Sequence, residues 1–99
     1  MTSMDMFTAL GDPTRRHIIE MLARHELSAS SISDRFPVSH SAISQHLKVL
    51  REAKLVEIEK SAQKRIYKIN PKAKGWIKKM MLLWNERLDR LEEVIRNGR

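Results

Sequence analysis

Turn-forming residues divide this 99-residue chain into short elements, and they limit the folds that it can adopt. The main breaks fall at Asp12-Pro13, Pro37 and Asn70-Pro71. Because such residues interrupt helices and strands, each interval between them must hold its own short elements. Asp12 followed by Pro13 is typical of a helix start, with aspartate as the N-cap and proline in the first turn. Since the chain has no repeat or linker, we expect a single domain over residues 1–99.

Apolar residues at helical spacing predict four helices in the first half of the chain. They span residues 4–10, 13–25, 28–35 and 39–53. Ser28 and Ser39 are suited to cap the third and fourth of these helices. In the fourth helix, Ile43, Leu47 and Leu50 share one face and predict its buried stripe.

Two runs rich in Val, Ile and Tyr follow, at residues 55–60 and 65–70. They predict a β-hairpin, although the four residues between them include no glycine. A helix-turn-helix over residues 28–53 and a hairpin over residues 55–70 together predict a winged helix-turn-helix. The expected fold is therefore mainly α, with five helices and a two-stranded β-hairpin wing.

The longest apolar pattern lies in residues 72–96 and predicts a C-terminal helix. Its apolar residues recur at alternating intervals of four and three, as in a coiled-coil seam. They are Ile77, Met81, Trp84, Leu88, Leu91 and Ile95. Because the domain is too small to cover all of so long a face, we expect a homodimer through this helix. The alternative is that the whole face packs on the core of its own subunit.

Basic charge is concentrated in one segment of the chain. Residues 51–79 hold 10 basic and 3 acidic side chains, and their net charge of +7 equals that of the whole protein. A local excess of this kind is typical of a surface that meets nucleic acid. The alternative is a lysine-rich surface that only keeps the protein soluble.

The composition excludes several classes of protein. The chain has no cysteine, which removes disulfides, thiolate metal sites and thiol-based sensing. No apolar run approaches the roughly 20 residues that span a membrane, and the first ten residues lack the features of a signal peptide. We therefore expect a soluble, cytoplasmic protein without a membrane partner. With no glycine-rich phosphate loop and no clustered acid–base pair, we do not expect an enzyme.

The fourth helix carries polar side chains away from its buried stripe. At about 100° per residue, Ser41, Gln45 and Lys48 point away from the core and Ser44 lies on the flank. Such side chains bond to base edges or phosphates, and the N-terminal turn should enter the major groove. His46 lies beside the buried stripe, and we expect it to pack rather than to read bases. The expected DNA-contacting residues are Ser39, His40, Ser41, Ser44, Gln45 and Lys48.

The predicted hairpin has a polar and basic tip. Strand alternation places its apolar residues inward; they are Val56, Ile58, Tyr67 and Ile69. The side chains left to touch the DNA backbone or minor groove are Lys60, Gln63, Lys64 and Arg65. For both surfaces the alternative is an ordinary solvated helix face and hairpin.

Three stretches of the sequence together resemble a known family. DPTRRHII at 12–19, SHSAISQHLKVLREAKLV at 39–56 and a basic hairpin that ends in RIYKI are similar to the ArsR/SmtB-type winged-helix repressors. The stretch WNERLDRLEEVI at 84–95 resembles the metal-independent, SdpR-like autorepressor branch. The resemblance implies a bacterial homodimeric repressor on an inverted-repeat operator. It also implies a dimer built from the first and last helices, which adds Phe7 to the expected interface.

The sequence departs from the sensing sites of this family. Many metal sensors carry ELCVCDL at the third helix, where this chain has ELSASSI, with Ser28 and Ser30 in place of both cysteines. Serine does not replace a soft thiolate ligand. No histidine follows His46, so the other common site, on the last helix, is missing as well. We expect no metal and no cofactor. The sequence does not indicate which effector, if any, the protein binds.

These expectations lead to a sequence-specific transcriptional regulator that binds double-stranded DNA. We expect a repressor, with its own promoter as one candidate operator. Two alternatives stay open. A winged-helix module that binds protein would be a monomer, and a non-specific architectural DNA binder would bind any duplex equally well.

Overall fold

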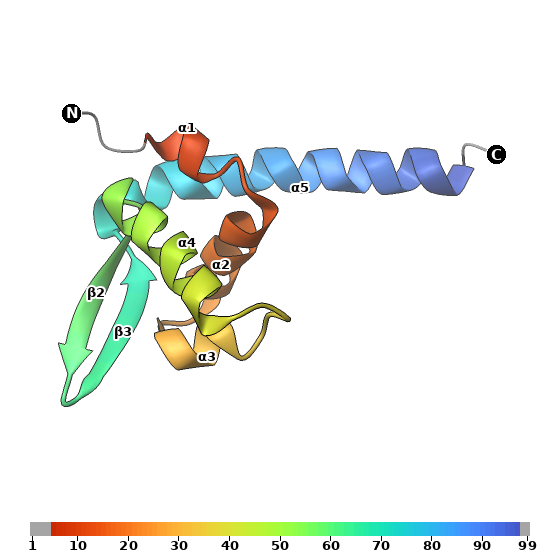
Figure 1. The fold of residues 1–99 in the computed structure, drawn as a ribbon. Helices are drawn as coiled ribbons and strands as arrows, with labels where there is room; N and C mark the ends of the chain where they lie inside the picture. The colour runs from red at the N-terminus through yellow and green to blue at the C-terminus, as the bar shows by residue number, and fades with distance from the viewer. Residues whose placement is uncertain (1–4, 98–99) are drawn as a thin grey trace.

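The computed structural model describes the backbone of residues 5–97 and the side chains of residues 5–85. Five α-helices and three strands form the expected winged helix-turn-helix (Figure 1). The elements are α1 (Met6–Ala9), α2 (Pro13–Arg24), β1 (Leu27–Ser28), α3 (Ala29–Ser33), α4 (His40–Glu52), β2 (Val56–Ser61), β3 (Lys64–Ile69), the 3-10 helix η1 (Pro71–Ala73) and α5 (Lys74–Asn97).

Side-chain caps start the helices where the sequence predicts them. The carboxylate of Asp12 accepts hydrogen bonds from the amides of Thr14 and Arg15, at 2.8 and 3.1 Å. The hydroxyls of Ser28 and Ser39 each accept one from the amide three residues later, at 3.2 and 3.1 Å. These bonds satisfy amides that have no partner inside the helix. They confirm the predicted starts of α2, α3 and α4.

One hydrophobic core joins the helices and the base of the hairpin. Its largest fully buried side chains come from α2, α3, α4 and the residue before β2. They are Ile18, Ile19, Ile32, Ile43, Leu47, Leu50 and Leu55. Burial of each such side chain contributes about 1.5–3 kcal/mol, so this cluster sets the position of α4 on the domain. The predicted stripe of α4 is confirmed.

The sheet contains a strand that the sequence analysis missed. β1 pairs antiparallel with β3, with Leu27 opposite Tyr67 and Ser28 opposite Ile66, and the strand order is β1-β3-β2. A strand of two residues has no alternation that a sequence pattern could reveal. Its consequence is structural, because backbone pairing now ties the start of α3 directly to the wing.

The wing has the predicted inward face and a shorter turn than expected. Val56 lies opposite Ile69 and Ile58 opposite Tyr67, and all four are buried or half-buried. Strand pairing continues to Ser61 and Lys64, so that the turn has two residues rather than four. Its first residue, Ala62, takes a left-handed φ of 57°, which is how the turn closes without glycine.

α4 also ends in a left-handed residue. Lys54 has a φ of 63°, and the amide of Leu55 donates to the carbonyl of Leu50 at 3.0 Å. This is a Schellman cap, in which the left-handed position usually holds glycine. The side-chain amide of Asn70, after β3, donates a hydrogen bond to the Lys54 carbonyl at 2.9 Å and so holds this turn against the end of the hairpin.

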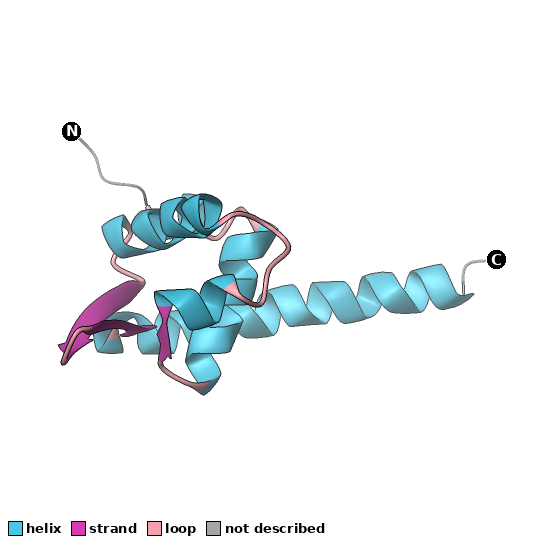
Figure 2. Cartoon of the chain, turned by 60° about the horizontal axis from the view of Figure 1, so that its bottom comes forward, coloured by secondary structure: helices cyan, strands magenta, loops and turns pink. Residues whose placement is uncertain are grey.

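The long helix α5 gives the molecule its shape. The domain measures 53 × 29 × 26 Å, and a helix of 24 residues is about 36 Å long. Its C-terminal half extends past the other elements in both views (Figures 1 and 2). α1 lies along α5 at the top of Figure 1, whereas α3 and the wing tip lie at the lower edge. Within residues 5–97, no helix combines the length and apolar character needed to cross a membrane.

We expect Lys54→Gly to stabilise the protein by about 0.5–1 kcal/mol. The left-handed conformation costs an L-residue about 1–2 kcal/mol, which glycine avoids. The larger entropy of glycine in the unfolded state reduces this gain in stability by about 0.5–1 kcal/mol. Urea denaturation at a fixed protein concentration measures the change. Lys54→Ala removes the same side chain but keeps Cβ, so it should bring no such gain. Equal gains in both variants would assign the effect to the lysine side chain instead of the backbone.

Candidate nucleic-acid interface

The outer face of α4 is exposed and polar. Ser41, Ser44, Gln45 and Lys48 are all exposed, on the side away from the buried stripe. None of these side chains has a hydrogen bond or ion pair to another residue in the part of the chain that the structure describes. Their donors and acceptors are therefore available for an external partner such as a base edge.

The first turn of α4 offers further polar groups. The Ser39 oxygen is occupied as the helix cap by the Ala42 amide, while its hydroxyl proton remains available to donate. His40 follows it and is exposed. The amides at a helix start and the positive end of its dipole favour a phosphate. Ser39 and His40 therefore suit backbone contact better than base reading.

His46 lies apart from this face, as expected. It is half-buried. Burial raises the pKa of Asp12, but hydrogen bonds from the Arg15 and Thr14 amides and the positive charge of His46 bring it below its usual value. Half-buried, His46 lies off the exposed outer face of α4.

The predicted wing residues gather at the tip of the hairpin. Lys60, Gln63, Lys64 and Arg65 are all exposed, and Lys60 lies opposite Arg65 in the strand register. In Figure 1 the tip lies at the same edge of the molecule as α3 and the start of α4. Cationic side chains beside the recognition helix are suited to meet the phosphate backbone.

A group of serines beside the wing was missed by the sequence analysis. A shallow pocket of about 280 Å³ is lined by Ser28, Ala29, Ser30, Ser31, Lys64 and Arg65. The Ser28 hydroxyl lies 3.2 Å from that of Ser30 and donates to that of Ser31 at 3.0 Å. Hydroxyl donors next to two cations can hold a phosphate. Residues 28–31 and 64–65 are far apart in the sequence, and the pairing of β1 with β3 brings them together. No sequence pattern could therefore have predicted this group.

The basic segment is divided among several places. Lys68 pairs with Glu57 and Glu59 at 3.7 and 3.6 Å, so its charge is balanced within the sheet. Lys60, Lys64 and Arg65 lie at the wing tip. Four more cations lie in η1 and the first turns of α5, namely Lys72, Lys74, Lys78 and Lys79. The excess basic charge of residues 51–79 therefore lies only in part at the wing tip.

The residues at the third helix do not fit the thiolate metal site of the family. Ser28 and Ser30 stand where metal sensors have cysteine, and the Ser28 oxygen is occupied as the cap of α3. Among the described residues, no group of three or more His, Asp or Glu is placed to hold a metal ion.

The apolar residues expected at a dimer interface divide into three sets. Ile77 is only 2% exposed and belongs to the core of its own subunit, so it offers no surface to a partner. Met81 and Trp84 are half-buried, and Phe7 is 67% exposed. The side chains of Leu88, Leu91 and Ile95 lie outside the described residues.

Exposed apolar surface remains where α1 meets α5. The rings of Phe7 and Trp76 meet edge to face, with centroids 5.3 Å apart. Leu83 is 52% exposed, and it lines a shallow pocket with Phe7, Met80 and Trp84. We call Phe7, Met80, Leu83 and Trp84 the α1/α5 face. Because large apolar side chains stay exposed on it, the subunit alone does not cover this face.

Comparison with known proteins identifies relatives of this arrangement. Residues 12–57, which contain α2, α3 and α4, match the family described as "Bacterial regulatory protein, arsR family". The HTH-type transcriptional regulator Rv2034 of Mycobacterium tuberculosis is 44% identical over 63 residues, which are 64% of this chain and 59% of that protein. The transcriptional repressor SdpR of Bacillus subtilis is 33% identical over 66 residues, which are 67% of this chain and 73% of SdpR.

HlyU of Vibrio cholerae shares both sequence and structure with this chain. The transcriptional activator HlyU is 38% identical over 65 residues, 66% of this chain and 60% of that protein. Its solved structure has a TM-score of 0.69 and 35% identity, covering 79% of this chain and 86% of the other. The match thus spans about three fifths of the length of Rv2034 and HlyU.

SdpR is one of several relatives of moderate similarity, so these comparisons show the family and not the branch. The family consists of regulators rather than enzymes. From its matched helix-turn-helix, its identity to SdpR and the fold it shares with HlyU, the chain belongs to the ArsR family of DNA-binding transcriptional regulators.

Proposed function

We propose that the protein is a homodimeric repressor that binds an inverted-repeat operator, its own promoter among the candidates. The observation that carries this proposal is the arrangement of two surfaces. In Figure 1, α3, the start of α4 and the wing tip lie toward the lower edge of the molecule, whereas α1 and α5, which carry the α1/α5 face, lie along its upper edge. Two subunits that pair through the apolar face therefore keep both polar faces available for DNA.

Within the DNA-binding surface, the two parts have different tasks. Ser41, Ser44, Gln45 and Lys48 read base edges in the major groove, since α4 presents them on its outer face. The wing tip contacts the phosphate backbone or minor groove through Lys60, Gln63, Lys64 and Arg65, and the serines of the neighbouring pocket support it. In the dimer, the two copies of α4 enter successive major grooves roughly 34 Å apart.

Repression follows from occupation of the promoter by the dimer, in the cytoplasm. The name of SdpR supports a repressor and the name of HlyU an activator, so the direction of regulation is a test of the proposal. The serines at the third helix support regulation without a metal. A resemblance to the autorepressor branch makes the gene's own promoter the first operator to examine.

The operator test selects bound fragments from the protein's own genome and sequences them. We expect an inverted repeat, protected in a footprint near the protein's own promoter, and reduced transcription from that promoter when the protein is added. Equal affinity for all duplexes at fixed salt would instead indicate an architectural binder. Increased transcription would overturn the assignment as a repressor.

Gln45→Ala and Lys64→Ala should separate base reading from backbone affinity. Loss of a base contact costs about 1–3 kcal/mol of discrimination, so Gln45→Ala should lower affinity for the operator but not for random DNA. Lys64→Ala should weaken both and reduce the salt slope by about one per subunit contact. Fluorescence anisotropy over a salt series measures both, with Lys79→Ala on α5 as the charge control. Equal losses on both kinds of DNA for both variants would contradict this division.

Leu83→Lys should dissociate the dimer, because it places a charge in the α1/α5 face. Leu82→Lys is a matched control, since Leu82 is 64% exposed but follows Lys78 and Lys79 on a polar flank of α5. Light scattering after size exclusion measures the mass. We expect a dimer for the unchanged protein and for Leu82→Lys, and a monomer for Leu83→Lys. A monomeric unchanged protein would favour the protein-binding module.

A further inference from the structure

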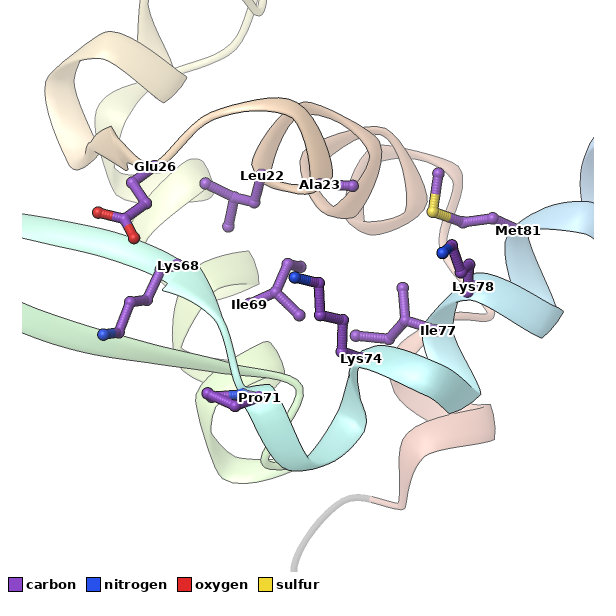
Figure 3. Close-up of a pocket in the computed structure, with 10 residues that line it drawn as sticks. All are labelled: Leu22, Ala23, Glu26, Lys68, Ile69, Pro71, Lys74, Ile77, Lys78 and Met81. Atoms are coloured by element: carbon purple, nitrogen blue, oxygen red, sulfur yellow. The ribbon is translucent and has the colours of Figure 1, made fainter.

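A hydrophobic pocket between α2, the end of β3 and the start of α5 lies outside the outer face of α4, the wing tip and the α1/α5 face (Figure 3). Its volume is about 330 Å³, within the range of small-molecule sites. Its apolar wall consists of Leu22, Ala23, Ile69, Pro71, Ile77 and Met81. The pocket can therefore hold a short hydrocarbon body out of water.

Charged groups lie around this apolar wall, and among residues 5–85 two of its three lysines have no ion pair. Lys68 is held by the glutamates of β2. Lys74 and Lys78, one turn apart on α5, line the pocket without an ion pair to any residue among 5–85. Figure 3 shows both extending from α5 toward α2, while Glu26 lies at the Lys68 end of the pocket. The pocket thus has one end with two available ammonium groups.

The pocket lies on the other flank of α5 from the α1/α5 face. At about 100° per residue, Lys74, Lys78 and Met81 point in a mean direction roughly 130° from that of Met80, Leu83 and Trp84. A second subunit on the α1/α5 face therefore leaves the pocket accessible. It is also separate from the wing tip, because the pocket touches β3 at Lys68 and Ile69 while the tip begins at Lys64.

We propose that this pocket binds a small amphipathic carboxylate, a molecule with one carboxylate and a hydrocarbon body of a few to about ten carbons. The carboxylate pairs with Lys74 and Lys78, and the hydrocarbon lies between Leu22, Ile69 and Ile77. Charge complementarity selects an anion over a cation of the same length. Each methylene that the apolar wall buries improves affinity by about fourfold.

Octanoate is the probe that tests this proposal, added below its micelle concentration to the full-length protein. Methyl-labelled methionine provides matched reporters in NMR spectra, because Met81 lines this pocket and Met80 lines the α1/α5 face. We expect the Met81 signal to shift in a saturable way and the Met80 signal to stay in place. Hexanoate, which lacks two methylenes, should bind about sixteenfold more weakly, and octylammonium should cause no saturable shift. A shift of Met80 alone, or equal binding of octylammonium, would overturn the proposal.

Paired variants test the role of the two lysines. Lys74→Gln with Lys78→Gln should weaken octanoate binding by about tenfold or more, because two charge-assisted contacts are lost. Lys72→Gln with Lys79→Gln removes the same charge from exposed side chains that do not line the pocket, and its affinity should stay within about twofold of the unchanged protein. All four side chains are exposed, so both variants should keep the fold, which circular dichroism verifies. If the two double variants weakened octanoate binding equally, the proposal would also be overturned, because octanoate would then respond only to the net charge of the protein.

Discussion

The pairing of β3 with a strand on each side is the interaction on which the rest of the molecule depends. Tyr67, near the middle of β3, lies opposite Leu27 on one side and Ile58 on the other. Through β1 this strand is tied to the start of α3, and through β2 to the end of α4. The helix-turn-helix and the wing are therefore held in one backbone network, which gives the proposed DNA-binding surface, made of these two elements, a defined geometry.

The same strand connects two different chemistries. Its first residues, Lys64 and Arg65, meet the serines of α3 at the edge proposed for DNA. Its last residues, Lys68 and Ile69, line the apolar pocket beside α5. Every residue of β3 is paired with β2. A backbone shift at one end of this short strand is therefore expected to reach the other end.

The sequence predicted well those features that depend on near neighbours. The caps at Asp12, Ser28 and Ser39 follow from the preference of short polar side chains for helix starts. The outer face of α4 follows from the helical period, and its polar residues are exposed as expected. The pattern missed β1, the two-residue turn at Ala62 and the serine pocket. Each of these depends on pairing with distant residues or on a left-handed backbone that a sequence without glycine does not signal.

The sequence by itself determined the family, the order of elements and the residues on the outer face of α4, because these depend on local periodicity and capping. Only the tertiary structure decided how the basic segment divides among the wing tip, the glutamate pair of Lys68 and the start of α5. It also decided that Ile77 turns inward while Leu83 stays exposed. The rotation of a helix about its own axis depends on which neighbours it packs against, and a pattern along one helix holds no information about them.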